Sequence, residues 1–310
     1  RLIQTPVAAP DGKRIAFSAL SHIYVMALDG GQPQRLTQNA LPEYQPSWSP
    51  DGRSITYITW TAQDDGHIWR KDLDGGAPRR LTTEAAYYSS PVFTADGKTV
   101  LALRSGTYAR MHILPFEFGP NRQADIVRIP ASGGAASVIT SGSYASVQTT
   151  DDPGRLYLHG ADGLSSLRLD GTERRALLQM TGPGYYFLEG RVPVEDMRIS
   201  PDGKRVLAQI NSQAYLATLP APGEEVATID IDDKDAKVRK LTRVGADFIG
   251  WADHGKTVSW AVGSTWFRLP LDQISFDETP LPEAERFPAA VSVPRDIPTG
   301  TLVLRGATAI

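Results

Sequence analysis

The five histidines of this sequence are the first residues to consider for chemistry, because imidazole serves both as a metal ligand and as a general base. No two of them are spaced two or four residues apart, the spacings at which a strand or a helix presents two imidazoles to one metal ion. A metal-dependent hydrolase needs such a pair, a carboxylate and an open coordination position for water. No metal centre is therefore predicted from the histidines, which are His22, His67, His112, His159 and His254.

Motifs for nucleophilic or nucleotide-dependent catalysis are also not identified. A serine hydrolase of the α/β type needs a G-x-S-x-G elbow, and the sequence has none. Neither a P-loop nor a G-x-G-x-x-G following a strand is identified. There is no cysteine, so disulfides and thiol chemistry are excluded. The chain alone is predicted not to be an enzyme and to need no cofactor of its own.

Six aspartates recur at regular intervals and raise the alternative of a ring of metal-binding carboxylates. Each is followed within two residues by glycine, which tolerates the positive φ of a tight turn. Carboxylates in such turns cap backbone N–H groups, so the pattern favours turn chemistry over metal binding. The aspartates are Asp11, Asp51, Asp96, Asp152, Asp202 and Asp253, at steps of 40, 45, 56, 50 and 51 residues.

These aspartates mark one repeating unit, which residues 46–82 show most clearly. Apolar and aromatic runs at 55–58 and 67–70 are separated by turn residues and followed by Arg80-Leu81-Thr82. Such runs predict short antiparallel strands joined by hairpins. A repeat of about 40 to 50 residues with four strands is typical of a propeller blade. The sequence therefore predicts an all-β fold, a six-bladed β-propeller of four-stranded antiparallel sheets, followed by a Pro-rich linker and the start of a further β element.

Three parts are predicted along the chain: the propeller at 1–276, the Pro-rich linker at 277–300 and the start of a following domain at 301–310. The prolines of the linker cannot sustain a helix and favour extended backbone, and residues 289–293 could add a strand to a blade. An aromatic, proline-bearing insertion at 108–121 interrupts the third unit. It is either a contact surface or a long hairpin folded on its own blade.

Charge and hydropathy exclude two classes of partner. Charged residues make up 22% of the chain and the net charge is -3, so there is no electrostatic basis for binding nucleic acid. No apolar run approaches the roughly 18 to 20 residues of a membrane span. Neither nucleic acid nor a membrane span is expected.

The residue types in the predicted loops favour a binding function. In a propeller, the loops that lead into the innermost strands surround one mouth of the central channel. Carboxylates and tyrosines there would suit a peptide or protein ligand with a cationic group, or a metal ion such as calcium. Alternatively, the same side chains plug the channel and bond to loop backbone. The predicted binding residues are Glu43, Tyr44, Tyr87, Tyr88, Tyr144, Glu195, Asp196 and Asp247.

The repeat resembles the TolB-type (PD40, WD-like) β-propeller, and the resemblance covers most of residues 5–275. One such element is a short match, but six follow in tandem. In the first unit the resemblance is carried by Pro10-Asp11-Gly12-Lys13-Arg14-Ile15-Ala16-Phe17, Ile23-Tyr24-Val25-Met26, Asp29-Gly30-Gly31 and Arg35-Leu36-Thr37, and the fifth unit has Ser200-Pro201-Asp202-Gly203-Lys204-Arg205.

A second resemblance lies near the C-terminus. Residues 293–307 are similar to the start of the metal-dependent amidohydrolases that carry TolB-like propellers upstream. This resemblance implies that the chain is the non-catalytic propeller of a larger protein. It would serve as an interaction or substrate-access module for an adjacent amidohydrolase-like domain that cleaves amide or peptide-type C–N bonds. That domain would hold zinc or another divalent metal, and a periplasmic or secreted location is implied.

Two alternatives stay open. The first is a free-standing TolB-type periplasmic protein that binds other proteins. The second is a propeller that is itself a lyase or glycosidase, which would need clustered carboxylates or histidines at the channel mouth.

Overall fold

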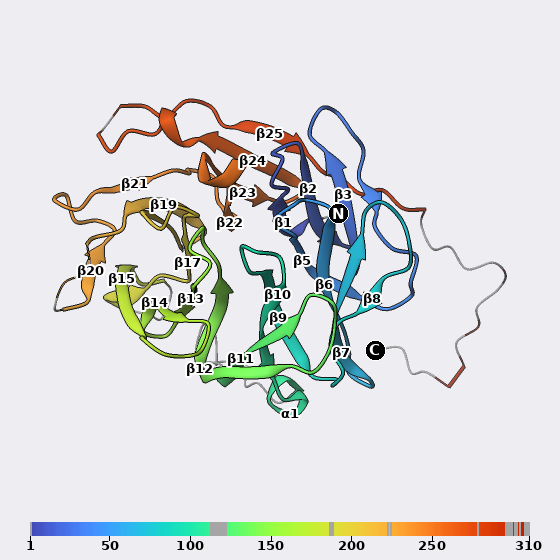
Figure 1. Ribbon diagram of the computed structural model, residues 1–310. Coiled ribbons are helices and arrows are strands. Elements are labelled where there is room, and N and C mark those ends of the chain that lie inside the picture. Colours follow the sequence, from blue (N-terminus) through green and yellow to red (C-terminus); the bar gives the residue numbers. More distant parts are fainter. Residues whose placement is uncertain are drawn as a thin grey trace.

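The computed structural model describes residues 2–111, 123–185, 189–221, 223, 225–277, 279–294, 300, 303, 305 and 306, and the statements below refer to these residues. Most of the predicted aromatic insertion lies outside them, as does most of the predicted further β element. The strands follow one another around a ring (Figure 1). One short helix, α1 (Thr107–Met111), leads into the insertion. No helix of the described part is long and apolar enough to cross a membrane.

The predicted all-β architecture is confirmed, with six successive four-stranded antiparallel units whose strands pair mainly in chain order. The first unit contains β1 (Gln4–Ala8), β2 (Arg14–Ala19), β3 (His22–Ala27) and β4 (Gln34–Arg35). The second contains β5 (Glu43–Trp48), β6 (Ser54–Thr61), β7 (Asp65–Asp72) and β8 (Arg79–Arg80). The fifth contains β17 (Asp196–Ile199), β18 (Arg205–Ile210), β19 (Gln213–Thr218) and β21 (Val238–Lys240). The sixth contains β22 (Asp247–Ala252), β23 (Thr257–Val262), β24 (Thr265–Pro270) and β25 (Glu285–Pro288).

The third and fourth units form one continuous sheet because they share a strand. The third consists of β9 (Tyr87–Phe93), β10 (Thr99–Ser105), β11 (Gln123–Pro130) and the first half of β12 (Ser137–Gln148). The second half of β12 pairs with β13 (Arg155–Gly160), which is followed by β14 (Gly163–Arg168) and β15 (Arg175–Pro183). Two further strands, β16 (Arg191–Pro193) and β20 (Ala227–Asp230), extend this sheet beside β15. Short 3-10 turns lie at Asp253–Gly255 and Leu271–Gln273.

Six hydrophobic clusters hold these units together, and each lies between two successive units. Sheets that pack face to face bury the side chains of both facing surfaces. Representative pairs, from the first-to-second interface to the fifth-to-sixth, are Ala16 with Trp48, Ile58 with Val100, Leu101 with Leu158, Leu164 with Met197, and Leu216 with Trp260. The sixth cluster joins the sixth unit to the first and includes Phe17, Tyr24 and Trp266.

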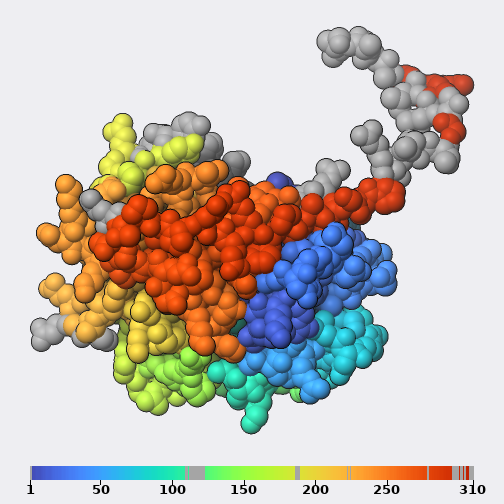
Figure 2. All heavy atoms as spheres, turned by 90° about the horizontal axis from the view of Figure 1, so that it is seen from above, coloured from blue at the N-terminus to red at the C-terminus, as the bar shows by residue number. Residues whose placement is uncertain are grey.

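Ring closure therefore depends on packing between the two end units. The sixth unit (orange to red) lies against the first (blue) in Figure 2. The backbone N–H of Ile3 donates to the carbonyl of Gly263 at 3.0 Å. Arg268 Nη1 donates to the carbonyl of Gly12 at 3.2 Å. No strand of one end unit pairs into the sheet of the other within the described residues.

Side chains also connect the innermost strands of neighbouring units. Trp48 Nε1 donates to the carbonyl of Val7, and Thr149 Oγ1 donates to that of Phe93. Gln148 bridges to β17 in both directions, because its amide donates to the carbonyl of Met197 and accepts from the N–H of Ile199. These bonds satisfy buried backbone groups that the sheets leave unpaired, so the innermost strands are aligned with one another around the ring.

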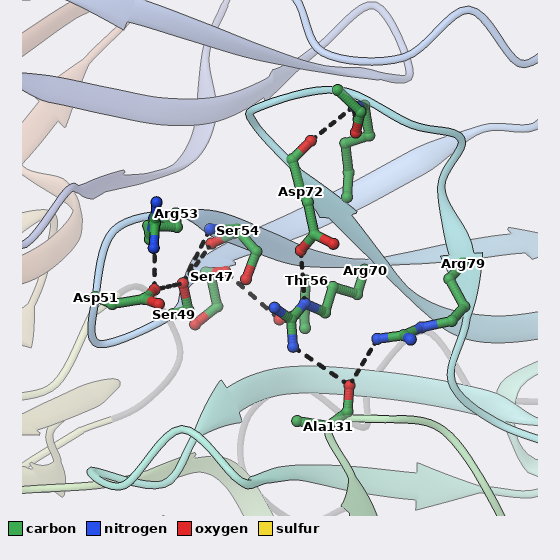
Figure 3. Close-up of polar contacts among 12 residues, drawn as sticks. Ser47, Ser49, Asp51, Arg53, Ser54, Thr56, Arg70, Asp72, Arg79 and Ala131 are labelled. Carbon is green, nitrogen blue, oxygen red and sulfur yellow. Dashed lines mark hydrogen bonds and ion pairs between the residues drawn. The ribbon is translucent and has the colours of Figure 1, made fainter.

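Five of the six marker aspartates have the turn role that the sequence predicts, whereas Asp253 Oδ2 accepts the hydroxyl of Thr257 at 2.7 Å. Asp51 Oδ1 accepts the N–H of Arg53 at 3.0 Å and the hydroxyl of Ser49 at 2.6 Å (Figure 3). The carboxylates of Asp11, Asp96, Asp152 and Asp202 accept corresponding backbone N–H groups.

Neighbouring turns also contact one another. Arg14 Nη2 in the first unit donates to the carbonyl of Gly52 in the second at 3.2 Å. Farther round the ring, the N–H of Asp151 donates to the carbonyl of Pro201 at 2.8 Å. We call the end of the ring that holds the six marker aspartates the turn face. The opposite end, where the innermost strands begin at Gln4, Glu43, Tyr87, Tyr144, Asp196 and Asp247, is the mouth face.

The predicted end of the propeller at residue 276 is too early. Strand β25 lies in the segment interpreted as a linker, and it pairs with β24 as the fourth strand of the sixth unit. Phe287 contacts Trp266 with ring centroids 5.6 Å apart, and Ala289 beyond it is buried. Pro288 is the last residue of the strand, and Pro280, Pro282 and Pro294 lie outside it, so prolines are kept out of the interior of the strand. The predicted strand at 289–293 is displaced by a few residues toward the N-terminus.

Alanine substitutions at two equivalent turn glycines measure two contributions to the free energy of unfolding. We predict that one substitution affects the turn alone and the other affects both the turn and the contact that closes the ring. Gly12 and Gly203 both have positive φ, 64° and 70°. A Cβ atom on Gly203 meets nothing within 4 Å, whereas one on Gly12 overlaps the carboxylate of Asp253 in the sixth unit. Gly203→Ala should cost about 1 kcal/mol, and Gly12→Ala roughly 1 to 3 kcal/mol more.

Urea unfolding of both variants measures the difference. Equal losses of stability would mean that the contact between Gly12 and Asp253 does not contribute to closing the ring.

Candidate functional site

The predicted binding residues lie at the starts of five innermost strands. Glu43, Tyr87, Asp196 and Asp247 are the first residues of β5, β9, β17 and β22. Tyr144 begins the part of β12 that pairs with β13. The topology therefore brings the predicted residues to one end of the ring, the mouth face. Their environments differ, and this difference separates structural residues from those that face solvent.

Glu43 and Tyr88 are buried and serve the fold. Glu43 is 0% exposed, and its carboxylate accepts the N–H of Ile23 at 3.1 Å and the hydroxyl of Thr37. Burial raises the pKa of Glu43, and the hydrogen bonds from Thr37 and Ile23 oppose that rise. Tyr88 is 1% exposed and donates its hydroxyl to the carbonyl of Glu84 at 3.1 Å. The fold therefore engages both side chains, Glu43 through the backbone of strand β3 and a hydroxyl, and Tyr88 through loop backbone.

The other tyrosines are partly accessible or lack a hydroxyl partner. Tyr44 is half-buried against the cluster between the second and third units. Tyr87 lies edge-on to Trp60, with ring centroids 6.0 Å apart. Tyr144 is 4% exposed, and its hydroxyl has no hydrogen-bond partner among the described residues. The guanidinium of Arg174 lies 5.7 Å from the centroid of the Tyr144 ring.

The three remaining carboxylates lie on the fifth and sixth units. Glu195 Oε1 accepts the N–H of Asn211 at 3.0 Å. Asp196 Oδ2 accepts from Arg198 Nε at 2.7 Å. Asp247 is exposed, and no hydrogen bond or ion pair of its side chain occurs among the described residues. Asp247 is therefore the predicted carboxylate that is most available to a ligand.

Backbone strain accompanies the mouth face, a feature that the sequence analysis did not predict. The innermost strands of four units contain a bulge with a non-glycine residue at positive φ, in which Thr5, Gln45, Ser90 and Phe248 have φ between 45° and 53°. Non-glycine residues pay a conformational cost there. Hydrogen bonds hold two of them, because the N–H of Gln45 donates to Ser18 Oγ and its side chain accepts the N–H of Ser90 at 2.7 Å.

His159 is a residue that the sequence analysis did not connect with the mouth. It is 1% exposed, and its Nδ1 has no hydrogen-bond partner among the described residues. That atom lies 3.6 Å from Asp196 Oδ1, which joins the fourth unit to the fifth. Burial lowers the pKa of His159, and the Asp196 carboxylate opposes this shift. Its contact with Asp196 depends on a neighbouring unit, so no local sequence signal could have identified it.

Two cavities lie between neighbouring units. One of about 160 Å³ borders His159 between the fourth and fifth units, next to the start of β17. The other, of about 420 Å³, lies on the turn face between the second and third units, and its lining includes Asp51, Arg70 and Asp96. Beside it, Arg70 and Arg79 both donate to the carbonyl of Ala131, which ties the second unit to the third (Figure 3).

Metal ligation and phosphate binding are two kinds of chemistry that can be checked against the described residues. No three histidine or carboxylate side chains among them are placed to hold one metal ion. The letters of a P-loop do occur once, at Gly250–Thr257, although the sequence analysis identified none. Those residues form the end of β22, a 3-10 turn and the start of β23. A phosphate-binding loop instead connects a strand to a helix, so this match is a hairpin.

We predict that His159→Gln will reduce the loss of stability in acid. The folded chain keeps His159 neutral, with a pKa below its ordinary value, so the unfolded chain takes up a proton first as the pH falls. Above about pH 6.5 His159 is neutral in both states and causes no pH-dependent change, and below that pH the folded chain loses stability because the unfolded chain binds the proton more readily. His159→Gln removes this contribution, so its urea midpoint should fall less between about pH 7.5 and 5.

His254→Gln is the matched control, because His254 is exposed on the turn face. Its urea midpoint should follow that of the unsubstituted chain. A fall of the same size in His159→Gln would contradict the assignment of this acid sensitivity to His159.

Comparisons with known proteins identify the family to which this fold belongs. The profile of the TolB beta propeller domain, PD40, matches residues 2–180, more than half of the chain. The uncharacterized protein Atu1656 of Agrobacterium fabrum is 44% identical over 54 residues, which is 16% of this chain and 18% of that protein. The chain thus corresponds to only a small part of this curated relative.

Solved structures share the fold at low sequence identity. TolB from Acinetobacter baumannii matches with a TM-score of 0.57 and 16% identity, over 87% of this chain and 61% of that one. A structure from Agrobacterium tumefaciens assigned as TolB matches with a TM-score of 0.51 and 17% identity, over 78% and 91%. An oligogalacturonate lyase in complex with manganese matches with a TM-score of 0.52 and 13% identity, over 87% and 74%. With the family profile, these matches show that the chain belongs to the TolB β-propeller domain family.

Proposed function

We propose that this chain is a non-catalytic interaction module of a larger protein, and that its mouth face docks a neighbouring metal-dependent hydrolase of amide or peptide-type C–N bonds. The propeller would hold that domain or restrict the access of substrates to it. The resemblance of residues 293–307 to the start of amidohydrolases supports the choice of partner. The zinc or other divalent metal ion would belong to the partner domain.

The main support for this proposal is the position of the large apolar side chains that are exposed to solvent. In an antiparallel four-stranded unit, the start of the first strand, the link between the second and third, and the end of the fourth lie at one end. In this ring that end is the mouth face. Apolar groups that gather on one exposed face are typical of interaction sites. Seven of the twelve large apolar side chains exposed in the described residues lie on these segments: Leu2, Leu41, Tyr108, Met111, Tyr185, Val244 and Phe248.

The turn face differs in composition. Its marker aspartates other than Asp253 accept backbone N–H groups of their own turns, as Asp51 and Asp96 do. Successive turns contact one another through groups such as Arg14 and the carbonyl of Gly52. A face whose polar groups are satisfied internally offers less to a partner than one that exposes apolar side chains. The mouth face is therefore the better candidate for docking.

A free-standing TolB-type module that binds other proteins is the second candidate. The family membership and the similarity to TolB structures favour it. It would use the same mouth face, but its partner would be a separate protein. The two candidates differ in whether the partner is covalently joined to the chain.

We predict that the mouth face will be protected when the chain is joined to the proposed hydrolase domain. Docking excludes water from the interface, so backbone amides of residues 41–45 and 244–248 should exchange hydrogen more slowly than in the chain alone. Amides of the turns at 50–53 and 95–98 are the internal control and should not change. Hydrogen-exchange mass spectrometry of the two proteins measures the difference.

Charged substitutions add a matched test of the docking surface. Val244→Asp, at a side chain that is 90% exposed, should abolish the protection, whereas Val138→Asp on the outer strand β12 should not. Equal exchange at the mouth face with and without the hydrolase domain would overturn the docking proposal. Metal-dependent turnover of dipeptides or acyl amino acids by the chain alone would overturn its non-catalytic role.

A further inference from the structure

The cavity between the fourth and fifth units is lined by a histidine with a polar atom that the fold does not use. Its lining combines His159 with Gln179 and Thr181 and with the apolar side chains of Met180 and Met197. Nδ1 of His159 is buried without a hydrogen-bond partner among the described residues. Burying a polar group without a partner costs free energy, so such a group is a candidate for contact with a ligand.

The propeller architecture does not require histidine at this position. His159 lies seven residues after the marker aspartate of the fourth unit. In four other units, the residue seven positions after the marker aspartate is buried or partly buried and has a side chain that does not ionise. These are Ser18, Ile58, Leu103 and Gln209.

The charges around the cavity favour a cation. Asp162 lies between the lining residues Ala161 and Gly163, and Glu195 and Asp196 lie between Val194 and Met197. Arg198 pairs with one oxygen of Asp196 at 2.7 Å. The two segments thus bring three carboxylates close to the cavity, against one guanidinium just beyond Met197, and the resulting field raises the local concentration of cations.

The separation of the two acceptors indicates what kind of cation fits. Asp196 Oδ1 lies 3.6 Å from His159 Nδ1, which is too long for a good direct hydrogen bond. An ammonium group has three N–H donors, so one such group can bond to both acceptors. Because burial lowers the pKa of His159, its imidazole stays neutral near pH 7, and a ring nitrogen that carries no proton can accept a hydrogen bond.

We propose that this cavity binds a short aliphatic primary amine. The ammonium group would donate to His159 and Asp196, and the hydrocarbon part would pack against Met180 and Met197. The cavity volume of about 160 Å³ can hold a group of roughly the size of benzene, which fills an engineered protein cavity of about 150 Å³. A free amine and the end of a lysine side chain share this chemistry. The site does not depend on whether a hydrolase domain docks on the mouth face.

Methionine methyl groups provide a direct measurement. The chain has four methionines, of which Met180 and Met197 line the cavity and Met26 lies in the core between the first and sixth units. In the chain labelled with ¹³C at the methionine methyls, n-butylammonium should shift the signals of Met180 and Met197. The shift should saturate with a dissociation constant on the order of 1 mM, a reasonable affinity for a five-atom ligand. The Met26 signal should not move.

Matched probes and variants test the proposed contacts. n-Butanol and butyrate have the same hydrocarbon chain without the cation, and they should bind at least about tenfold more weakly. His159→Leu places at this position the residue that the third unit already has there, so the fold should be retained, and n-butylammonium should bind at least about tenfold more weakly. His254→Gln, at an exposed histidine, should bind it as the unsubstituted chain does.

Further outcomes decide the source of the ligand and the fate of the proposal. A lysine amide with a blocked α-amine that reproduces the shifts would identify a peptide side chain as ligand, and its failure beside n-butylammonium would identify a free amine. Unmoved Met180 and Met197 signals would mean that the cavity holds only water. Equal binding of n-butanol, or undiminished binding by His159→Leu, would also overturn the proposal.

Discussion

Burial of sheet faces between neighbouring units is the interaction on which this structure depends. A four-stranded sheet has two faces, and neither can be covered from within the unit. Each of the six clusters therefore draws residues from two successive units, and the last joins Trp266 to Phe17 and Tyr24 across the ends of the chain. At about 25 cal/mol per Å² of buried apolar surface, such interfaces dominate the stability of the ring. The sixth interface, between the last unit and the first, therefore closes the ring through side-chain packing.

This constraint explains how polar residues at the mouth face divide into two groups. The innermost strands must be aligned, and buried polar side chains such as Glu43 and Gln148 do this by bonding to backbone of a neighbouring unit. Their hydrogen-bonding capacity is consumed by the fold. Asp247 and the exposed apolar side chains lie at the same end but outside these contacts. The docking surface that we propose would be built from the residues that alignment does not need.

His159 belongs to neither group, because it is buried and yet has no partner for Nδ1. Other units place residues at this offset that need no partner or are readily satisfied, so histidine here adds a cost without benefit to packing. Its closest charged neighbour, Asp196, is already paired with Arg198. A ligand in the adjacent cavity, as we propose, would offset that cost. Burial also lowers the pKa of His159, so the folded chain is expected to lose stability in acid.

The sequence by itself determined the repeat, the turns and the class of fold. These are local properties, because an aspartate followed by glycine specifies a tight turn and β-branched runs specify short strands whatever surrounds them. The tertiary structure decided which residues at the mouth are buried, as the difference between Glu43 and Asp247 shows. It also decided that Glu285–Pro288 completes the sixth unit and that His159 faces Asp196. Each of these depends on contacts between segments far apart in sequence, and local propensity carries no record of which segments a closed ring brings together.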